Sequence, residues 1–144
     1  MQRRSFLKST ATISAFSIIK PHLVFGSTVN SAIRLGVIGC GNRGTAVISS
    51  MSANTNTNIV AIADLFTDKL LTAENNYNQL NAAKNFAPLK KSSIYKGSKA
   101  YMRLLENKEV DAVLISSPAY SHVGFLEAAA AAGKHIYCEK PVAT

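Results

Sequence analysis

The chain has 144 residues, of which 47% are hydrophobic and 17% are charged, and its formal net charge is +8. That length suffices for one domain with a buried core and is too short for two, and the composition is that of a globular protein rather than a disordered chain. The positive charge does not indicate nucleic-acid binding, because part of it is confined to the start of the chain. Four basic residues there have no acidic partner: Arg3, Arg4, Lys8 and Lys20.

The other basic residues and the two cysteines form no motif. A small basic cluster lacks the aromatic stacking motif of RNA-binding domains, so we interpret it as a solvated loop. Its members are Lys84, Lys90, Lys91, Lys96 and Lys99. Cys40 and Cys138 are too few for a disulfide framework, and no spacing of Cys or His predicts a metal site. We expect both cysteines to be buried packing residues at strand ends.

Residues 1–30 are predicted to be an export signal and linker rather than part of the fold. Arg3 and Arg4 are followed by Ser-Phe-Leu and Lys8, an order that resembles the bacterial twin-arginine motif. The moderately apolar run from Thr10 to Ile19 is shorter than the roughly 20 residues that a membrane-spanning helix needs, and no clear cleavage site follows it. We therefore expect a twin-arginine translocase to export the folded protein to the periplasm. The alternative is an amphipathic or disordered N-terminus.

The rest of the chain, residues 31–144, is predicted to alternate strands and helices. Strands are expected at 33–38, 58–63, 110–115 and 135–138, with a short one at 93–95, and helices at 45–53, 67–84, 101–107 and 122–132. The longer strands are apolar throughout, which is typical of strands buried on both faces of a parallel sheet. The sequence thus predicts one dinucleotide-binding domain of the α/β class, with the doubly wound parallel sheet of a Rossmann fold.

A glycine-rich segment supports a dinucleotide site. Gly39, Gly41 and Gly44 form the pattern G-x-G-x-x-G between the first strand and the first helix. In such a site the first glycine permits a tight turn, the second lets the backbone approach the pyrophosphate, and the third lets the helix pack closely. The helix N-terminus offers N–H groups to the anion. We expect Asn42 and Arg43 to contribute as well, although Arg43 is also compatible with a plain surface position, and the glycines with a structural turn.

Asp64 ends the second predicted strand, 20 residues beyond Gly44. At this spacing the carboxylate is expected to accept hydrogen bonds from the ribose hydroxyls of the adenosine half. A 2′-phosphate would place negative charge against Asp64, and the next residues, Leu65 and Phe66, supply no compensating cation. The sequence therefore favours NAD over NADP as the cofactor.

Four segments in the same order resemble the Gfo/Idh/MocA oxidoreductases, and the resemblance covers residues 32–143. They are residues 36–44, the strand ending in Asp64, residues 110–118 leading to His122, and residues 132–141. The last is the most specific, because it places Glu139-Lys140-Pro141 after an alanine-rich helix, a Gly-Lys pair and a strand.

The resemblance implies roles for single residues. Lys140 matches the lysine that lies near the nicotinamide and the substrate and helps catalysis. Glu139 and Pro141 hold its loop, and in many members the proline peptide is cis.

A second loop is also matched. Ser117, Pro118 and His122 correspond to a loop that lines the cofactor site, although Ala119 replaces the asparagine of many members. His122 is also compatible with a position at a helix start that has no ligand contact.

The resemblance further implies a second domain, which binds the substrate and holds a proton-transferring Asp–His pair. Residues 31–144 contain neither. We therefore expect the N-terminal part of an exported oxidoreductase that acts on a sugar or polyol and assembles as a homo-oligomer when full length. Alone, the fragment is expected to bind NAD weakly or not at all and to be inactive. Two alternatives stay open: an NAD-dependent glycoside hydrolase of the same superfamily, and a non-catalytic nucleotide-binding module.

Overall fold

The computed structural model describes residues 31–142, so the predicted export signal lies outside the described residues. The described part contains a five-stranded, fully parallel sheet in the order β3-β2-β1-β4-β5. The strands are β1 (Ile33–Ile38), β2 (Thr57–Asp64), β3 (Ile94–Lys96), β4 (Ala112–Ile115) and β5 (His135–Cys138). This order and direction confirm the predicted doubly wound fold.

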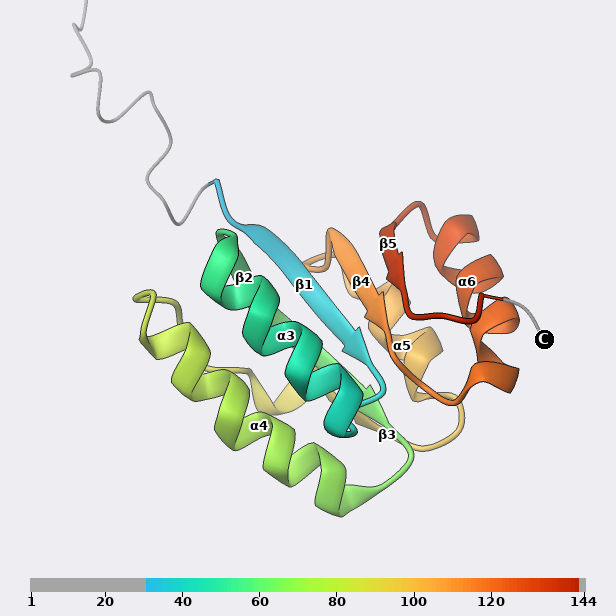
Figure 1. Cartoon of the computed structure of the whole chain (residues 1–144), viewed down its shortest axis with the longest axis horizontal. Coiled ribbons are helices and arrows are strands. Elements are labelled where there is room, and N and C mark those ends of the chain that lie inside the picture. The colour runs from blue at the N-terminus through green and yellow to red at the C-terminus, as the bar shows by residue number, and fades with distance from the viewer. Residues whose placement is uncertain (1–30, 143–144) are drawn as a thin grey trace, which may run out of the picture.

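Helices cover both faces of the sheet, with α3 and α4 on one face and α5 and α6 on the other (Figure 1). Their bounds are α3 (Asn42–Asn54), α4 (Thr67–Ala82), α5 (Ala100–Glu106) and α6 (His122–Ala131), with short 3-10 helices η1 (Lys91–Ser93) and η2 (Ala119–Ser121). Most bounds lie within two residues of the predicted ones. The main difference is α3, which begins three residues earlier than expected, inside the glycine-rich segment.

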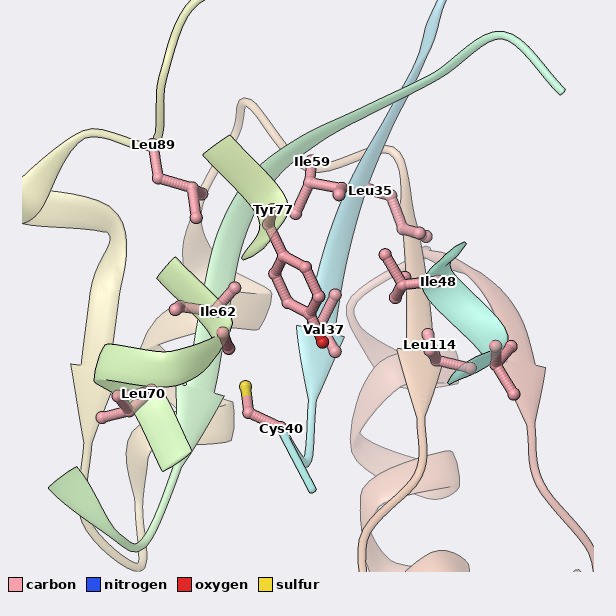
Figure 2. Close-up of a cluster of buried hydrophobic side chains, with 12 residues drawn as sticks. Leu35, Val37, Cys40, Ile48, Ile59, Ile62, Leu70, Tyr77, Leu89 and Leu114 are labelled. Carbon is pink, nitrogen blue, oxygen red and sulfur yellow. The ribbon is translucent and has the colours of Figure 1, made fainter. Parts of the chain in front are cut away.

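Each face of the sheet has its own apolar core. On the α3/α4 side, Tyr77 of α4 is fully buried among strand residues such as Val37 and Ile62 (Figure 2). On the α5/α6 side, Leu104 and Ala129 pack against β1 and β4. Since each fully buried Leu, Ile or Val contributes about 1.5–3 kcal/mol, these two layers fix the strand ends that carry the site.

Asn81, near the end of α4, forms hydrogen bonds with the part of β2 that β3 does not reach. Its side-chain amide donates to the Ile59 carbonyl at 2.8 Å, and its Oδ1 accepts from the Ile59 N–H at 3.0 Å. The neighbouring strand β3 pairs with β2 only from Ile62 onward. Because Asn81 is 1% exposed, this pairing satisfies backbone groups of β2 that water cannot reach.

The two cysteines differ in environment, and both are free thiols. Cys40 is buried as expected, and its thiol donates to the Ala63 carbonyl at 3.9 Å. Burial, reinforced by the nearby Asp64 carboxylate, raises the pKa of Cys40 to about 12. Cys138 is only half-buried, because it ends the edge strand β5, so the prediction for it was wrong.

Residues 31–142 contain neither a membrane-spanning helix nor a candidate metal cluster. None of the helices in that range has the length and apolar character needed to cross a membrane. The same residues hold no group of three or more His, Cys, Asp or Glu side chains able to bind a metal ion.

Candidate functional site

A cleft of about 740 Å³ lies at the carboxyl ends of the strands. It opens where the chain leaves β1, whose neighbours β2 and β4 lead to helices on opposite faces of the sheet. Ligands of open α/β sheets bind at such switch points. The lining includes every predicted pyrophosphate contact except Gly44, together with Asp64, Ser117 and Pro118.

The glycine-rich loop packs so tightly at two positions that only glycine fits. Gly39 has φ +95°, and a Cβ there would lie 2.7 Å from the Ser117 nitrogen. A Cβ at Gly44 would lie less than 3.0 Å from both the Gly39 carbonyl oxygen and the Ser116 hydroxyl. Gly41 is different, because a Cβ there meets nothing within 4 Å. Its backbone therefore borders open space in the cleft, as a backbone that approaches a ligand must.

The N-terminus of α3 points its first turn at this open space. Gly41 is the N-cap residue, no side chain caps the helix, and the first turn holds no acidic residue. The first helical hydrogen bond runs from the Thr45 N–H to the Gly41 carbonyl at 3.0 Å. The N–H groups of Asn42, Arg43 and Gly44 thus have no acceptor within the helix. Such groups, with the positive end of the helix dipole, fit a pyrophosphate.

Asp64 lines the cleft beside the glycine-rich loop, and two backbone donors hold its carboxylate. The Cys40 N–H donates to Oδ2 at 2.7 Å, and the Phe66 N–H donates to Oδ1 at 2.9 Å. The first bond joins the carboxylate to the glycine-rich loop, so the two predicted cofactor elements form one unit. Each carboxylate oxygen has more than one lone pair, which leaves acceptor capacity for ribose hydroxyls.

Lys69, in the first turn of α4, also lines the cleft near Asp64. Sequence reasoning considered only Leu65 and Phe66 as sources of a compensating cation and so missed it. The sequence did indicate this position, because α4 begins directly after Asp64 and its first turn therefore lies at the same edge of the sheet. Lys69 is the one basic side chain that lines this side of the described cleft.

The α5/α6 side of the cleft is largely apolar. Pro118 and the rings of Tyr101 and Phe125 form this wall, and Tyr120 is exposed at its rim. The two rings have centroids 4.3 Å apart and are tilted by 33° to one another. The Ser116 hydroxyl donates to the Gly39 carbonyl at 2.7 Å and ties the wall to the glycine-rich loop. The aromatic residues belong to helices whose sequences showed only helical spacing, so the sequence analysis gave them no role.

Residues 139–141 leave β5 beside the cleft. Arg43 donates to the Glu139 carboxylate at 2.9 Å, and this ion pair holds the pKa of Glu139 below its usual range. The Glu139 N–H donates to the Ile115 carbonyl at 2.9 Å. The Lys140–Pro141 peptide is cis. Lys140 is exposed, and neither it nor Glu139 is among the described residues that line the cleft.

His122 lies outside the cleft lining as well. It is 2% exposed, and its two ring nitrogens contact backbone carbonyls, Nε2 that of Ser117 at 2.7 Å and Nδ1 that of Pro141 at 2.8 Å. The structure thus places His122 behind the cleft wall, at the start of α6. Its contact with the cofactor loop is to backbone, which no sequence pattern records.

Comparison with known proteins gives the site a context. Residues 33–144 match the Gfo/Idh/MocA family, described as an oxidoreductase family with an NAD-binding Rossmann fold. The chain is 37% identical to the inositol 2-dehydrogenase of Pseudomonas fluorescens, over 78% of this chain and 30% of that protein. It is 30% identical to glycosyl hydrolase family 109 protein 2 of Shewanella sp. (strain ANA-3), over 98% of this chain and 34% of that protein.

A solved structure agrees with these relatives. The 3-ketoreductase KijD10 of Actinomadura kijaniata, in complex with NADP and TDP-benzene, aligns with a TM-score of 0.58 and 31% identity, over 78% of this chain and 30% of that one. The chain spans 25% to 34% of the length of the first curated relatives that it matches.

Proposed function

We propose, from the premise that the chain belongs to the Gfo/Idh/MocA oxidoreductase family with its NAD-binding Rossmann fold, that it is the cofactor-binding part of an enzyme that transfers a hydride between NAD and a sugar or polyol. One observation carries this proposal. The open backbone at Gly41, the uncapped start of α3 and the Asp64 carboxylate all face the same cleft. A dinucleotide needs this combination of an anion site and a ribose acceptor.

NAD is the proposed physiological cofactor, although the family accommodates NADP as well. The carboxylate of Asp64 is fixed by two N–H donors and cannot easily turn away from a 2′-phosphate. Lys69 partly offsets this charge, and so we expect measurable NADP binding that is weaker than NAD binding. Comparing the dissociation constants of the two cofactors tests this order.

The substrate class rests on the relatives. One is named an inositol 2-dehydrogenase, and the KijD10 complex is that of a 3-ketoreductase. Both names describe redox chemistry at a hydroxyl or keto group. In the present chain, Lys140 is exposed on the loop after β5 and is proposed to lie near the nicotinamide and the substrate. There its ammonium would stabilise charge on the reacting oxygen while the cofactor, when bound, accepts the hydride.

A second candidate function is NAD-dependent glycoside hydrolysis, which the similarity to glycosyl hydrolase family 109 proteins favours. The two reactions differ in their net use of cofactor. A dehydrogenase converts NAD to NADH in proportion to substrate consumed, whereas the glycosidase regenerates its NAD in each cycle. Incubating the native protein with NAD and with inositols, aldoses and nitrophenyl glycosides therefore separates them. NADH accumulation supports the first, and released nitrophenol at constant NAD supports the second. If none of these substrates yields NADH or nitrophenol, both proposed reactions are refuted.

Export by the twin-arginine route is proposed from the first residues of the chain. The order of Arg3, Arg4, Phe6 and Lys8 supports it. The combined change Arg3→Lys and Arg4→Lys is expected to retain the protein in the cytoplasm of a bacterial host, measured by cell fractionation. Unchanged periplasmic recovery would contradict the proposal.

A further inference from the structure

The short segment of residues 139–141, which carries Lys140, is fixed at both ends. Glu139 is bound through its backbone to Ile115 and through its carboxylate to Arg43. The Pro141 carbonyl is bound by the His122 ring. Between these two anchors, the Lys140 side chain is exposed. The position of the Lys140 backbone is therefore determined by its neighbours.

His122 differs from the other anchor because it faces two acceptors. Carbonyl oxygens accept hydrogen bonds and never donate them, so each of the two contacts requires an N–H on that ring nitrogen. A ring with both nitrogens protonated donates to both carbonyls at once. A ring with one N–H donates to one of them at a time. A ring with an N–H at Nδ1 therefore donates to the Pro141 carbonyl whether or not Nε2 is also protonated.

Burial makes this link hard to replace. His122 is 2% exposed, so a carbonyl that loses its donor gains no solvent in exchange. An unpaired buried acceptor is costly, and the chain segment would have to move to find another donor. Ser117 belongs to the cleft wall, whereas Pro141 directly follows Lys140. The ring thus spans the wall of the cofactor cleft and the loop that carries Lys140.

We infer that His122 is a positioning residue, which fixes the loop that carries Lys140 beside the cofactor cleft by binding the Pro141 carbonyl. The inference rests on the proposed function, in which Lys140 acts beside the nicotinamide. The ring is absent from the lining of the described cleft, so it acts through Lys140 and not on the cofactor.

Two substitutions separate the effects of the two hydrogen bonds of the His122 ring. In His122→Asn the amide nitrogen takes the place of Nδ1, which keeps the donor to Pro141 and removes the donor to Ser117. In His122→Gln the amide nitrogen takes the place of Nε2, which keeps the donor to Ser117 and removes the donor to Pro141. Both place one amide in the same buried space, so a loss of stability from burial is similar in the two variants. They form a matched pair.

The first readout needs no cofactor. Amide NMR spectra of the 144-residue chain report the order of the Lys140 backbone. We expect the Lys140 and Val142 amides to keep their positions and order in His122→Asn and to shift and lose order in His122→Gln. The Thr45 amide in α3 serves as an internal control and should not change. Equal effects of both variants on Lys140, or none, overturn the inference.

The second readout is kinetic and uses the native enzyme. We expect His122→Gln to lower kcat by about 10- to 100-fold, because misplacement of a reacting group by about 1 Å costs this much. Its KM for NAD should stay close to that of the unmodified protein. His122→Asn should retain most of kcat. Loss of kcat in both variants to the same extent would assign His122 a purely structural role and refute the inference.

Failure of the proposed function would look different. If the native enzyme bound no NAD at millimolar concentration, the cofactor site would be refuted. The comparison of the Asn and Gln variants in the absence of cofactor would still decide whether His122 holds Lys140.

Discussion

Three glycine-to-alanine substitutions separate the structural and the ligand-binding functions of the loop. At Gly44, a Cβ would lie less than 3.0 Å from the Gly39 carbonyl and from the Ser116 hydroxyl, so backbone must move. Overpacking of this kind costs about 1–3 kcal/mol of stability. The same movement displaces the N–H groups of the first turn of α3. Losing one charge-assisted hydrogen bond to the pyrophosphate costs about 1.5–3 kcal/mol, or about 10- to 150-fold in NAD affinity.

The other two substitutions each place a methyl group in open space, one inside the cleft and one outside it. Gly41→Ala places a methyl group in open space, so stability changes by less than about 1 kcal/mol while NAD affinity falls, because the methyl group fills the space that the pyrophosphate needs. Gly124→Ala, in the exposed first turn of α6, also meets no atom within 4 Å. It should raise stability by about 0.5–1 kcal/mol and leave NAD binding unchanged.

Urea unfolding gives the stability of each variant, and titration of the purified protein with NAD gives its affinity. The expected pattern is a loss of both properties in Gly44→Ala, a loss of affinity alone in Gly41→Ala, and a gain of stability alone in Gly124→Ala. Unchanged NAD affinity in Gly41→Ala would refute the assignment of this loop as the pyrophosphate site. Unchanged stability in Gly44→Ala would refute the packing argument.

Three further results are expected. Asn81→Leu leaves the Ile59 N–H and carbonyl unpaired and should destabilise the fold by about 2–6 kcal/mol in urea unfolding. Arg43→Gln should lower stability at pH 7, and this loss should shrink as the pH falls below the unfolded pKa of Glu. Arg43 lowers the pKa of Glu139 in the folded protein, so the pair stabilises above the unfolded pKa of Glu, about 4.3, and this contribution is lost as the pH falls through the folded pKa. Finally, Asp64→Asn should narrow the preference for NAD over NADP by at least about 10-fold in binding assays, because a carboxylate near a 2′-phosphate is strongly unfavourable.

The fold could be predicted because it depends on patterns along the chain. Three of the strands, β1, β2 and β4, are mainly apolar runs, and β5 has the bounds expected from its sequence. The predicted start of α3, at Thr45, is three residues too late, because helix-forming residues alone do not indicate that the helix begins inside the glycine-rich segment. Glycine at position 44 is needed there for packing against Gly39, which is a contact in space rather than a propensity.

The sequence predicted only those parts of the site that directly follow strands in the chain. The glycine-rich loop and Asp64 occur on the same cleft as expected, because parallel strands end at one edge. Lys69 could have been found, because it lies in the first turn of the helix that follows Asp64. The contacts of His122 depend on how α6 packs against residues 117 and 141, which the sequence pattern does not supply. For the same reason, the ion pair of Arg43 with Glu139, which joins residues 96 positions apart, had no signal in the sequence.

The thiol of Cys40 stands inside the nucleotide loop, where chemical damage would be most harmful. With a pKa of about 12, roughly one molecule in 100,000 carries the reactive thiolate at neutral pH. Oxidants and alkylating agents act on the thiolate, and the buried sulfur is closed to them as well. The nucleotide loop thus contains a free cysteine that its burial and raised pKa protect from oxidation.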